Sequence, residues 1–187
     1  MIWPGPDLLG AAYGLSELAL SIMKRSGAGT QKADRASLRV LWGTILVAVA
    51  AAIVTARLVP AAHSPLLARA YGVGVVVFAL GLALRWYSIL HLGRFFTVDV
   101  AIASDHHVVD DGPYRWVRHP SYTGAIVAFA GYGVCIGNWL SLALLVVPIS
   151  AAFARRIAVE EAALTAALGE PYRAYAARTW RLVPWVY

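Results

Sequence analysis

A polar segment at residues 110–124 combines several side chains that could do chemistry with a backbone kept irregular by proline. Gly112-Pro113 forces a turn there, and Pro120 disfavours a helical conformation for His119. The segment lies between two long apolar stretches, which puts its chemistry at a membrane surface. Irregular backbone at that depth is tolerated where it is buried in protein or lines a polar cavity. Such a cavity suits a polar cofactor. The alternative is a plain re-entry loop whose arginines touch phosphates and whose tyrosines lie in the interface.

A second polar cluster, Arg155-Arg156-Ile-Ala-Val-Glu160-Glu161, follows the next apolar stretch. Arg156 precedes Glu160 by four residues, so on a helix the two share a face and can pair. One interpretation is a solvated helix end with an ordinary surface ion pair. The functional interpretation gives the charges opposite roles: Glu160 would hold a cationic or hydroxylated part of a cofactor, and Arg156 an anionic acceptor.

Arg85 lies inside an otherwise apolar stretch. Near a helix end it could simply extend to the lipid headgroups. Charges within the membrane are equally candidates for function. Both interpretations stay open, and Arg85 is kept as a candidate acceptor-binding residue.

The histidines do not form a metal-binding pattern. Zinc sites need ligands at workable spacing with a supporting second layer of contacts. His106 and His107 are adjacent, and no HxxxH or HxxE pattern on a helix accompanies them. We therefore expect no metal, although three histidines and three aspartates occur nearby: His106, His107, His119, Asp105, Asp110 and Asp111.

The composition indicates an integral membrane protein of one domain. Of 187 residues 60% are apolar and 14% charged, against roughly 45–50% and about 25% in soluble domains. The net charge of +6 comes from basic residues clustered beside apolar stretches. We interpret them as topology signals and contacts to anionic lipid, not as a nucleic-acid surface.

The apolar stretches predict an all-α fold with five spans, at about residues 4–23, 40–57, 70–91, 121–136 and 139–155. The first contains Asp7 and Glu17. Residues 120–154 carry no formal charge, and as one helix they would be about 52 Å long, too long for a hydrocarbon core of about 30 Å. Gly137-Asn138 at the middle is a turn signal, so this run is a helical hairpin.

Basic residues predict the orientation. Thirteen of the 16 lie in the segments 24–39 and 93–120 and in the tail from 155, which share one side if there are five spans. The other side receives only Arg57 and Arg69. Because basic loops stay in the cytosol, we expect the N-terminus outside and the C-terminus inside. The 93–120 loop and the C-terminal segment would then form a cytosolic cofactor pocket.

Three elements together resemble the isoprenylcysteine carboxyl methyltransferase family. They are Gly112-Pro-Tyr-Arg-Trp-Val-Arg-His-Pro-Ser-Tyr-Thr-Gly124, Arg156-x-x-x-Glu160-Glu161 and Leu168-Gly-Glu-Pro-Tyr-Arg-Ala-Tyr175, within a match over about 85–187. The resemblance implies a five-helix membrane enzyme that takes S-adenosylmethionine from the cytosol and a lipid acceptor from the bilayer. It implies cofactor contacts at His106, His107, Val108, Val109, Tyr114, His119, Pro120, Ser121, Tyr122 and Glu160, with Arg156 facing the acceptor.

The expected reaction is methyl transfer from S-adenosylmethionine to an oxygen of a lipid-like acceptor, foremost the carboxylate of an isoprenylcysteine-type molecule or peptide. The methyl is already activated, so such an enzyme mainly supplies alignment. A carboxylate needs no base, whereas a long-chain phenol or pyrone lipid, the second choice, would need His119 or Glu160 to remove a proton. Arg156, Glu160 and His119 are thus the candidate catalytic residues. An NADPH-dependent membrane reductase and a small membrane scaffold are the alternatives from other classes.

Overall fold

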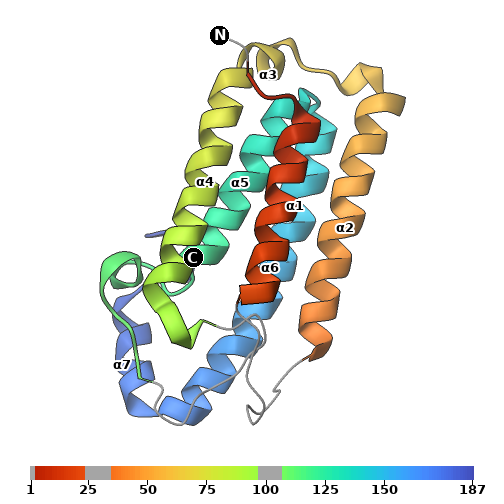
Figure 1. The fold of residues 1–187 in the computed structure, drawn as a ribbon. Coiled ribbons are helices and arrows are strands. Elements are labelled where there is room, and N and C mark those ends of the chain that lie inside the picture. Colours follow the sequence, from red (N-terminus) through yellow and green to blue (C-terminus); the bar gives the residue numbers. More distant parts are fainter. Residues whose placement is uncertain (1–2, 24–34, 97–106) are drawn as a thin grey trace.

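The computed structural model describes residues 3–23, 35–96 and 107–187, and within these ranges the chain forms helices and no strand. Five long helices run side by side, with the N-terminus at the end of the bundle that carries α3 and with α7 at the opposite end (Figure 1). The α-helices are α1 Pro6–Met23, α2 Arg35–Leu58, α3 Pro65–Arg69, α4 Tyr71–Leu92, α5 Pro120–Ile136, α6 Trp139–Leu168 and α7 Glu170–Arg178. Short 3-10 helices are η1 Pro60–Ala62, η2 Gly93–Phe95 and η3 Gly112–Arg115.

The protein is an integral membrane protein by the length and composition of its helices. Three segments of the described chain are long and apolar enough to cross a bilayer: Ala36–Leu58, Tyr71–Phe95 and Trp139–Leu168. The helix α5 is apolar but shorter, and α1 is not among the three. Large apolar side chains such as Leu15, Leu46 and Leu80 are more than 60% exposed, which suits lipid and not water. The five-span arrangement remains a prediction.

Glycines bring α4 and α5 into close contact. A Cβ added at Gly81 would overlap the backbone nitrogen of Ala128, and one at Gly124 would lie 2.6 Å from the backbone nitrogen of Arg85. Small residues allow helix backbones to approach closely in membranes, where packing replaces the hydrophobic effect. The result is that Arg85 on α4 lies against the first turns of α5.

The hairpin between α5 and α6 turns where the sequence predicts. Gly137 ends α5 in the left-handed region with φ 74°. Asn138 then caps α6, its side chain accepting from the Ser141 backbone N–H at 3.0 Å. Asn138 also donates to the Val59 carbonyl oxygen at 3.2 Å, which ties the hairpin to the end of α2.

The last long helix continues well past the residue at which the predicted span ends. At 1.5 Å per residue its 30 residues are about 45 Å long, more than the hydrocarbon core of about 30 Å. Alanine, leucine and glutamate, strong helix formers, fill the part beyond residue 155. Gly169, with φ 62°, ends it, and Pro171 lies in the first turn of α7. This extension carries the two glutamates of the second polar cluster beyond the bundle.

Candidate functional site

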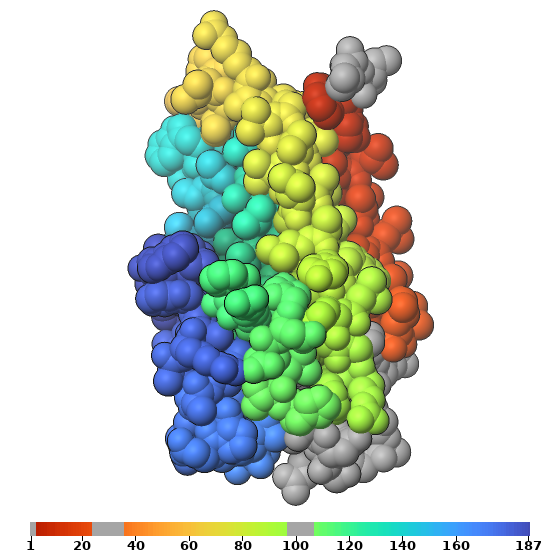
Figure 2. Space-filling view, turned by 90° about the vertical axis from the view of Figure 1, so that its left-hand side faces the viewer, coloured from red at the N-terminus to blue at the C-terminus, as the bar shows by residue number. Residues whose placement is uncertain are grey.

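The irregular loop is held by the C-terminal segment. Gly112 has φ 53°, and a Cβ there would lie 2.7 Å from the His91 ring. The backbone N–H groups of Arg118 and His119 donate to the carbonyl oxygens of Trp180 and Arg181 at 2.7 and 3.0 Å. Figure 2 shows the loop lying between the end of α4 and the C-terminal segment. The two segments expected to form one pocket are therefore neighbours.

Glu161 connects the loop, α6 and the C-terminal segment. Its Oε1 accepts from Arg118 Nε at 2.7 Å and its Oε2 from Arg181 Nε at 2.9 Å, while His119 Nε2 lies 3.4 Å from Oε1. Arg118 also donates to the carbonyl oxygens of Ala176, at 2.8 Å, and Thr179. Arg118 was not among the expected site residues, although its place directly before His119 was a usable signal. With these contacts Glu161 and Arg118 fasten the loop to the rest of the protein.

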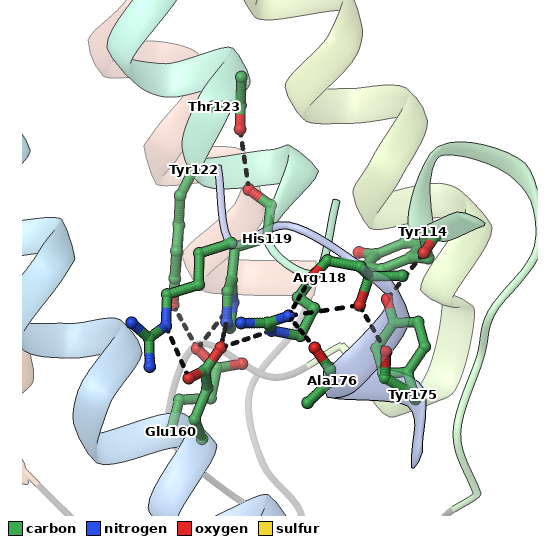
Figure 3. A network of polar contacts seen from close by, with 11 residues as sticks. Tyr114, Arg118, His119, Tyr122, Thr123, Glu160, Tyr175 and Ala176 are labelled. Atoms are coloured by element: carbon green, nitrogen blue, oxygen red, sulfur yellow. Dashed lines mark hydrogen bonds and ion pairs between the residues drawn. The ribbon is translucent and has the colours of Figure 1, made fainter. Parts of the chain in front are cut away.

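Glu160 lies beside two aromatic side chains, Tyr122 and His119. Tyr122 donates its hydroxyl to Glu160 Oε2 at 2.9 Å, and His119 Nδ1 lies 3.8 Å from the same oxygen (Figure 3). The His119 and Tyr122 rings stack at 5.5 Å with an interplanar angle of 7°, and Tyr122 in turn stacks on Phe153. The Glu160 side chain is 29% exposed and that of Glu161 13%. Glu160 is thus the more accessible carboxylate for a ligand.

Tyr114, in the loop, has a buried hydroxyl that donates a hydrogen bond. Its hydroxyl donates to the Ser88 carbonyl oxygen on α4 at 3.2 Å, and its own carbonyl oxygen accepts from the Tyr175 hydroxyl at 2.8 Å. Burial raises the pKa of Tyr114 and of Tyr175, so both hydroxyls stay protonated at neutral pH. They can donate hydrogen bonds but cannot serve as bases.

Arg85 and Arg156 line one small cavity inside the bundle, of about 40 Å³, together with Tyr122. Arg156 is 2% exposed and donates to the Ser37 hydroxyl on α2 at 2.6 Å. Arg85 is 8% exposed and binds both carboxylate oxygens of Glu17, at 2.6 and 2.8 Å. The interpretation in which Arg85 extends to the lipid headgroups is wrong, because its guanidinium is buried in protein.

The remaining expected cofactor residues are spread along the same loop. Pro120 and Ser121 are buried at the start of α5. Val108 and Val109 are half-buried, and His107 is exposed with its ring 4.7 Å from that of Phe95. His106 lies outside the described residues.

A larger apolar cavity of about 630 Å³ adjoins the small one. Residues of α1 and α2 form most of its wall, and α4 and α5 contribute the rest. Tyr13, Glu17 and Trp42 belong to the walls of both cavities. An apolar chain in the larger cavity would therefore end near the two arginines.

The family model described as the isoprenylcysteine carboxyl methyltransferase (ICMT) family matches residues 72–166. The chain belongs to this family. The matched range begins in α4 and ends in the extension of α6, so it contains the loop, the two arginines and both glutamates. Neither α1 nor α2 is part of it.

Curated members of the ICMT family are similar over the same region. A protein-S-isoprenylcysteine O-methyltransferase of Schizosaccharomyces pombe is 37% identical over 98 residues, 51% of this chain and 42% of the relative. Protein-S-isoprenylcysteine O-methyltransferase B of Arabidopsis thaliana is 36% identical over 115 residues, 60% of this chain and 58% of the relative. The chain thus spans about half the length of the curated relatives that it matches.

A solved structure of the eukaryotic intramembrane Ras methyltransferase ICMT has a similar fold over most of this chain. The TM-score is 0.63 at 27% sequence identity, and the match covers 78% of this chain and 52% of that one. The similarity extends beyond the range of the family model and supports the membrane fold of the family.

Proposed function

We propose that this protein transfers a methyl group from S-adenosylmethionine to the carboxylate of an isoprenylcysteine-type lipid. The observation that carries the proposal is the arrangement of Glu160 and Arg156 around Tyr122. Arg156 and Glu160 are one turn apart on α6. Tyr122 donates to Glu160, and together with Arg156 it lines the small cavity. Glu160, which is anionic and adjoins the loop, and Arg156, which is cationic and adjoins the small cavity, therefore both lie near Tyr122. These two parts are called the loop side and the cavity side of the site.

The loop side fits a cationic, polar cofactor. Glu160 is a partly exposed carboxylate beside two aromatic rings, and the attraction between a carboxylate and a nearby cation strengthens as water is excluded. The Tyr114 hydroxyl, which donates to Ser88, offers its oxygen as a neutral acceptor, and the loop offers backbone groups. Membership in a methyltransferase family implies a methyl donor, and S-adenosylmethionine would supply a methyl group activated on a sulfonium. His119, Tyr122 and Glu160 would hold and orient it, with His107 to Val109 and Pro120 and Ser121 as further contacts.

The cavity side favours a carboxylate over a phenol as the acceptor. Arg156 presents a planar cation that matches a carboxylate, and a carboxylate is a nucleophile without losing a proton. A phenol would need a base at the cavity. The candidates are His119 and Glu160, and neither lines the cavity. The two ring nitrogens of His119 face Glu160 and Glu161, and Glu160 accepts from the Tyr122 hydroxyl. The geometry therefore gives no support for proton removal from an acceptor held by Arg156.

The large apolar cavity suits the lipid part of the acceptor. It adjoins the cavity of the two arginines, and its walls on α1 and α2 are mostly apolar. A hydrocarbon chain that arrives from the bilayer leaves an apolar phase already, so its fit to this cavity would come from packing against the walls. With the tail in this cavity the carboxylate would reach Arg156, and alignment with the methyl group supplies the main rate gain.

Methyl incorporation from labelled S-adenosylmethionine tests the proposal. The purified protein would be given an N-acetylated S-farnesylcysteine, a long-chain phenol, and no acceptor, with NADPH binding measured in parallel. We expect methylation of the carboxylate lipid and no binding of NADPH. Methylation of the phenol alone would replace the proposed acceptor, and NADPH binding without methylation would favour a reductase.

Arg156→Lys separates the two sides of the site. The variant keeps the positive charge but loses the planar fork, so turnover should fall at least tenfold while cofactor affinity stays within twofold. Calorimetry with S-adenosylhomocysteine gives the affinity. A parallel loss of affinity and turnover would contradict the assignment of Arg156 to the acceptor.

A further inference from the structure

Glu17 is a buried acid on α1, a helix that the sequence predicts to span the membrane. Glu17 lies in a part of the helix that has no other charged residue, and its side chain is 7% exposed. It binds Arg85 through both oxygens, with Arg85 Nε at 2.6 Å and Nη2 at 2.8 Å. The remaining terminal nitrogen, Nη1, donates to the Ser121 carbonyl oxygen at 3.3 Å. All three nitrogens of this guanidinium are therefore engaged with protein atoms.

The charged side chains that the structure describes around the small cavity are not equal in number of each sign. Of the side chains that the structure describes, three charged ones line it, namely Glu17, Arg85 and Arg156. These two cations and one anion contribute a net charge of +1 around a volume of about 40 Å³. That volume holds a group of a few atoms, such as a carboxylate. In so confined a space a surplus or deficit of one charge has a large effect on binding.

We propose that Glu17 sets the charge selectivity of the acceptor site, so that a lipid with one negative charge binds and a lipid with two is rejected. The inference rests on the proposed function. Glu17 acts in two ways: it lowers the charge around the cavity by one unit, and it occupies the two nitrogens with which Arg85 could bind an anion. Arg85 then contributes its charge, and Arg156 makes the direct contact to the acceptor.

A purely architectural role for the pair gives a different expectation. Buried ion pairs contribute little net stability and can often be replaced by apolar residues. The helix α1 also has an uncharged link to α4, since Trp86 Nε1 donates to the Ser16 hydroxyl at 2.7 Å. If the Glu17–Arg85 pair only joined the two helices, removing it would affect all acceptors alike. If it selects charge, the effect depends on the charge of the ligand.

Three probes with the same tail separate these possibilities: N-acetyl-S-farnesylcysteine, farnesyl monophosphate and farnesol. At about pH 8 the phosphate carries nearly two charges, because its second pKa is about 6. Binding would be measured by calorimetry on the detergent-solubilised protein, without turnover. The proteins are wild type, Glu17→Gln, Arg85→Gln, the double variant, and Ser16→Ala as an uncharged control on the same helix. Counted over the described lining residues, the cavity charges of the first four are +1, +2, 0 and +1.

We expect wild type and Ser16→Ala to prefer the carboxylate over the phosphate. Glu17→Gln should shift this ratio toward the phosphate by about tenfold or more, since a second charge and a free arginine fork become available. Arg85→Gln should weaken both anions relative to farnesol, and the double variant should restore the preference of the wild type. Farnesol should bind all five alike.

A carboxylate-to-phosphate ratio that is the same in wild type and Glu17→Gln would overturn the inference. If Glu17→Gln does not fold, the comparison of Arg85→Gln with the double variant still decides, because a ratio that the double variant fails to restore contradicts charge selection. Wild type that binds farnesol but neither anion would instead refute the proposed acceptor. The two failures are thus distinguishable.

Discussion

Adjacent glutamates on α6 have different surroundings, and this difference assigns them different roles. Glu161 accepts from two arginines and lies beside His119. Glu160 is the more exposed and accepts from the Tyr122 hydroxyl. Consecutive helix residues point about 100° apart, so one side chain turns to the C-terminal segment and the other to the aromatic pair. A change at one position should therefore not reproduce the effect of a change at the other.

Alanine at each glutamate tests this division. Glu161→Ala leaves Arg118 half-buried without its carboxylate, and we expect a loss of about 2–4 kcal/mol of stability. Glu160→Ala should change stability little but weaken S-adenosylhomocysteine by about 1–3 kcal/mol, the range of a lost hydrogen bond to a charged group. Denaturant unfolding and calorimetry measure the two quantities. Equal profiles for the two variants would contradict the division.

Two tyrosines on α7 form a second matched pair. Both are 4% exposed. The Tyr175 hydroxyl donates to the Tyr114 carbonyl oxygen, whereas that of Tyr172 has no hydrogen-bond partner among the residues that the structure describes. Tyr175→Phe should cost about 1–2 kcal/mol, and Tyr172→Phe should be neutral or stabilising by up to about 1 kcal/mol. Unfolding midpoints of the two variants measure this, and a larger loss for Tyr172→Phe would show that its hydroxyl has a partner.

At the scale of the elements, the contact of α4 with α5 positions the arginine side of the site. Gly81 and Gly124 allow the two backbones to meet, and Arg85 lies one turn after Gly81. From there Arg85 reaches Glu17 on α1 and the carbonyl oxygen of Ser121 on α5. Any side chain between the helices would move this guanidinium away from the cavity.

Gly81→Ala should therefore be costly in a way that an ordinary helical glycine is not. Its Cβ would overlap backbone atoms of α5, and we expect a loss of about 1–3 kcal/mol from overpacking. Gly43 on α2 has nothing within 4 Å of an added Cβ, so Gly43→Ala should stabilise by about 0.5–1 kcal/mol. Thermal unfolding in detergent compares the two. A stabilising Gly81→Ala would contradict the close contact.

At the scale of the whole molecule, the two ends of the bundle carry different chemistry. Figure 1 shows the loop between α2 and α4 at one end and α7 at the other. The loop of the site, the C-terminal segment and the extension of α6 gather at the end with α7 (Figure 1). If that end faces the cytosol, as the basic residues predict, cofactor and lipid would reach the site from different phases.

Cysteine labelling from each side of the membrane tests the orientation. Cysteines would replace His63, in the loop after α2, and Arg173 on α7, both exposed positions. The native Cys135 is 4% exposed and should stay unlabelled. An impermeant reagent added to intact cells should label position 63 only, and position 173 only after the cells are opened. Labelling of both from outside would exclude this topology.

The sequence by itself determined the features that depend on neighbouring residues. Gly137-Asn138 sets the hairpin turn, Gly169 and Pro171 separate α6 from α7, and Pro120 keeps His119 out of the helix. In each case the φ preference of one residue or a missing backbone donor acts within a few positions. The motif around His119 and the spacing of Arg156 and Glu160 were also sufficient to recognise the family.

Only the tertiary structure decided which distant side chains meet. Glu17 pairs with Arg85 and Arg156 binds Ser37, contacts that span 68 and 119 residues of sequence. Apolar helices rich in alanine, valine and leucine are nearly interchangeable as partners, so their sequences do not specify which faces pack together. The helix faces that pack together are set by the close contacts at glycines and by the need of each buried charge for a partner. For this reason the acid on α1, which interrupted a predicted span, proved to lie at the wall of the arginine cavity.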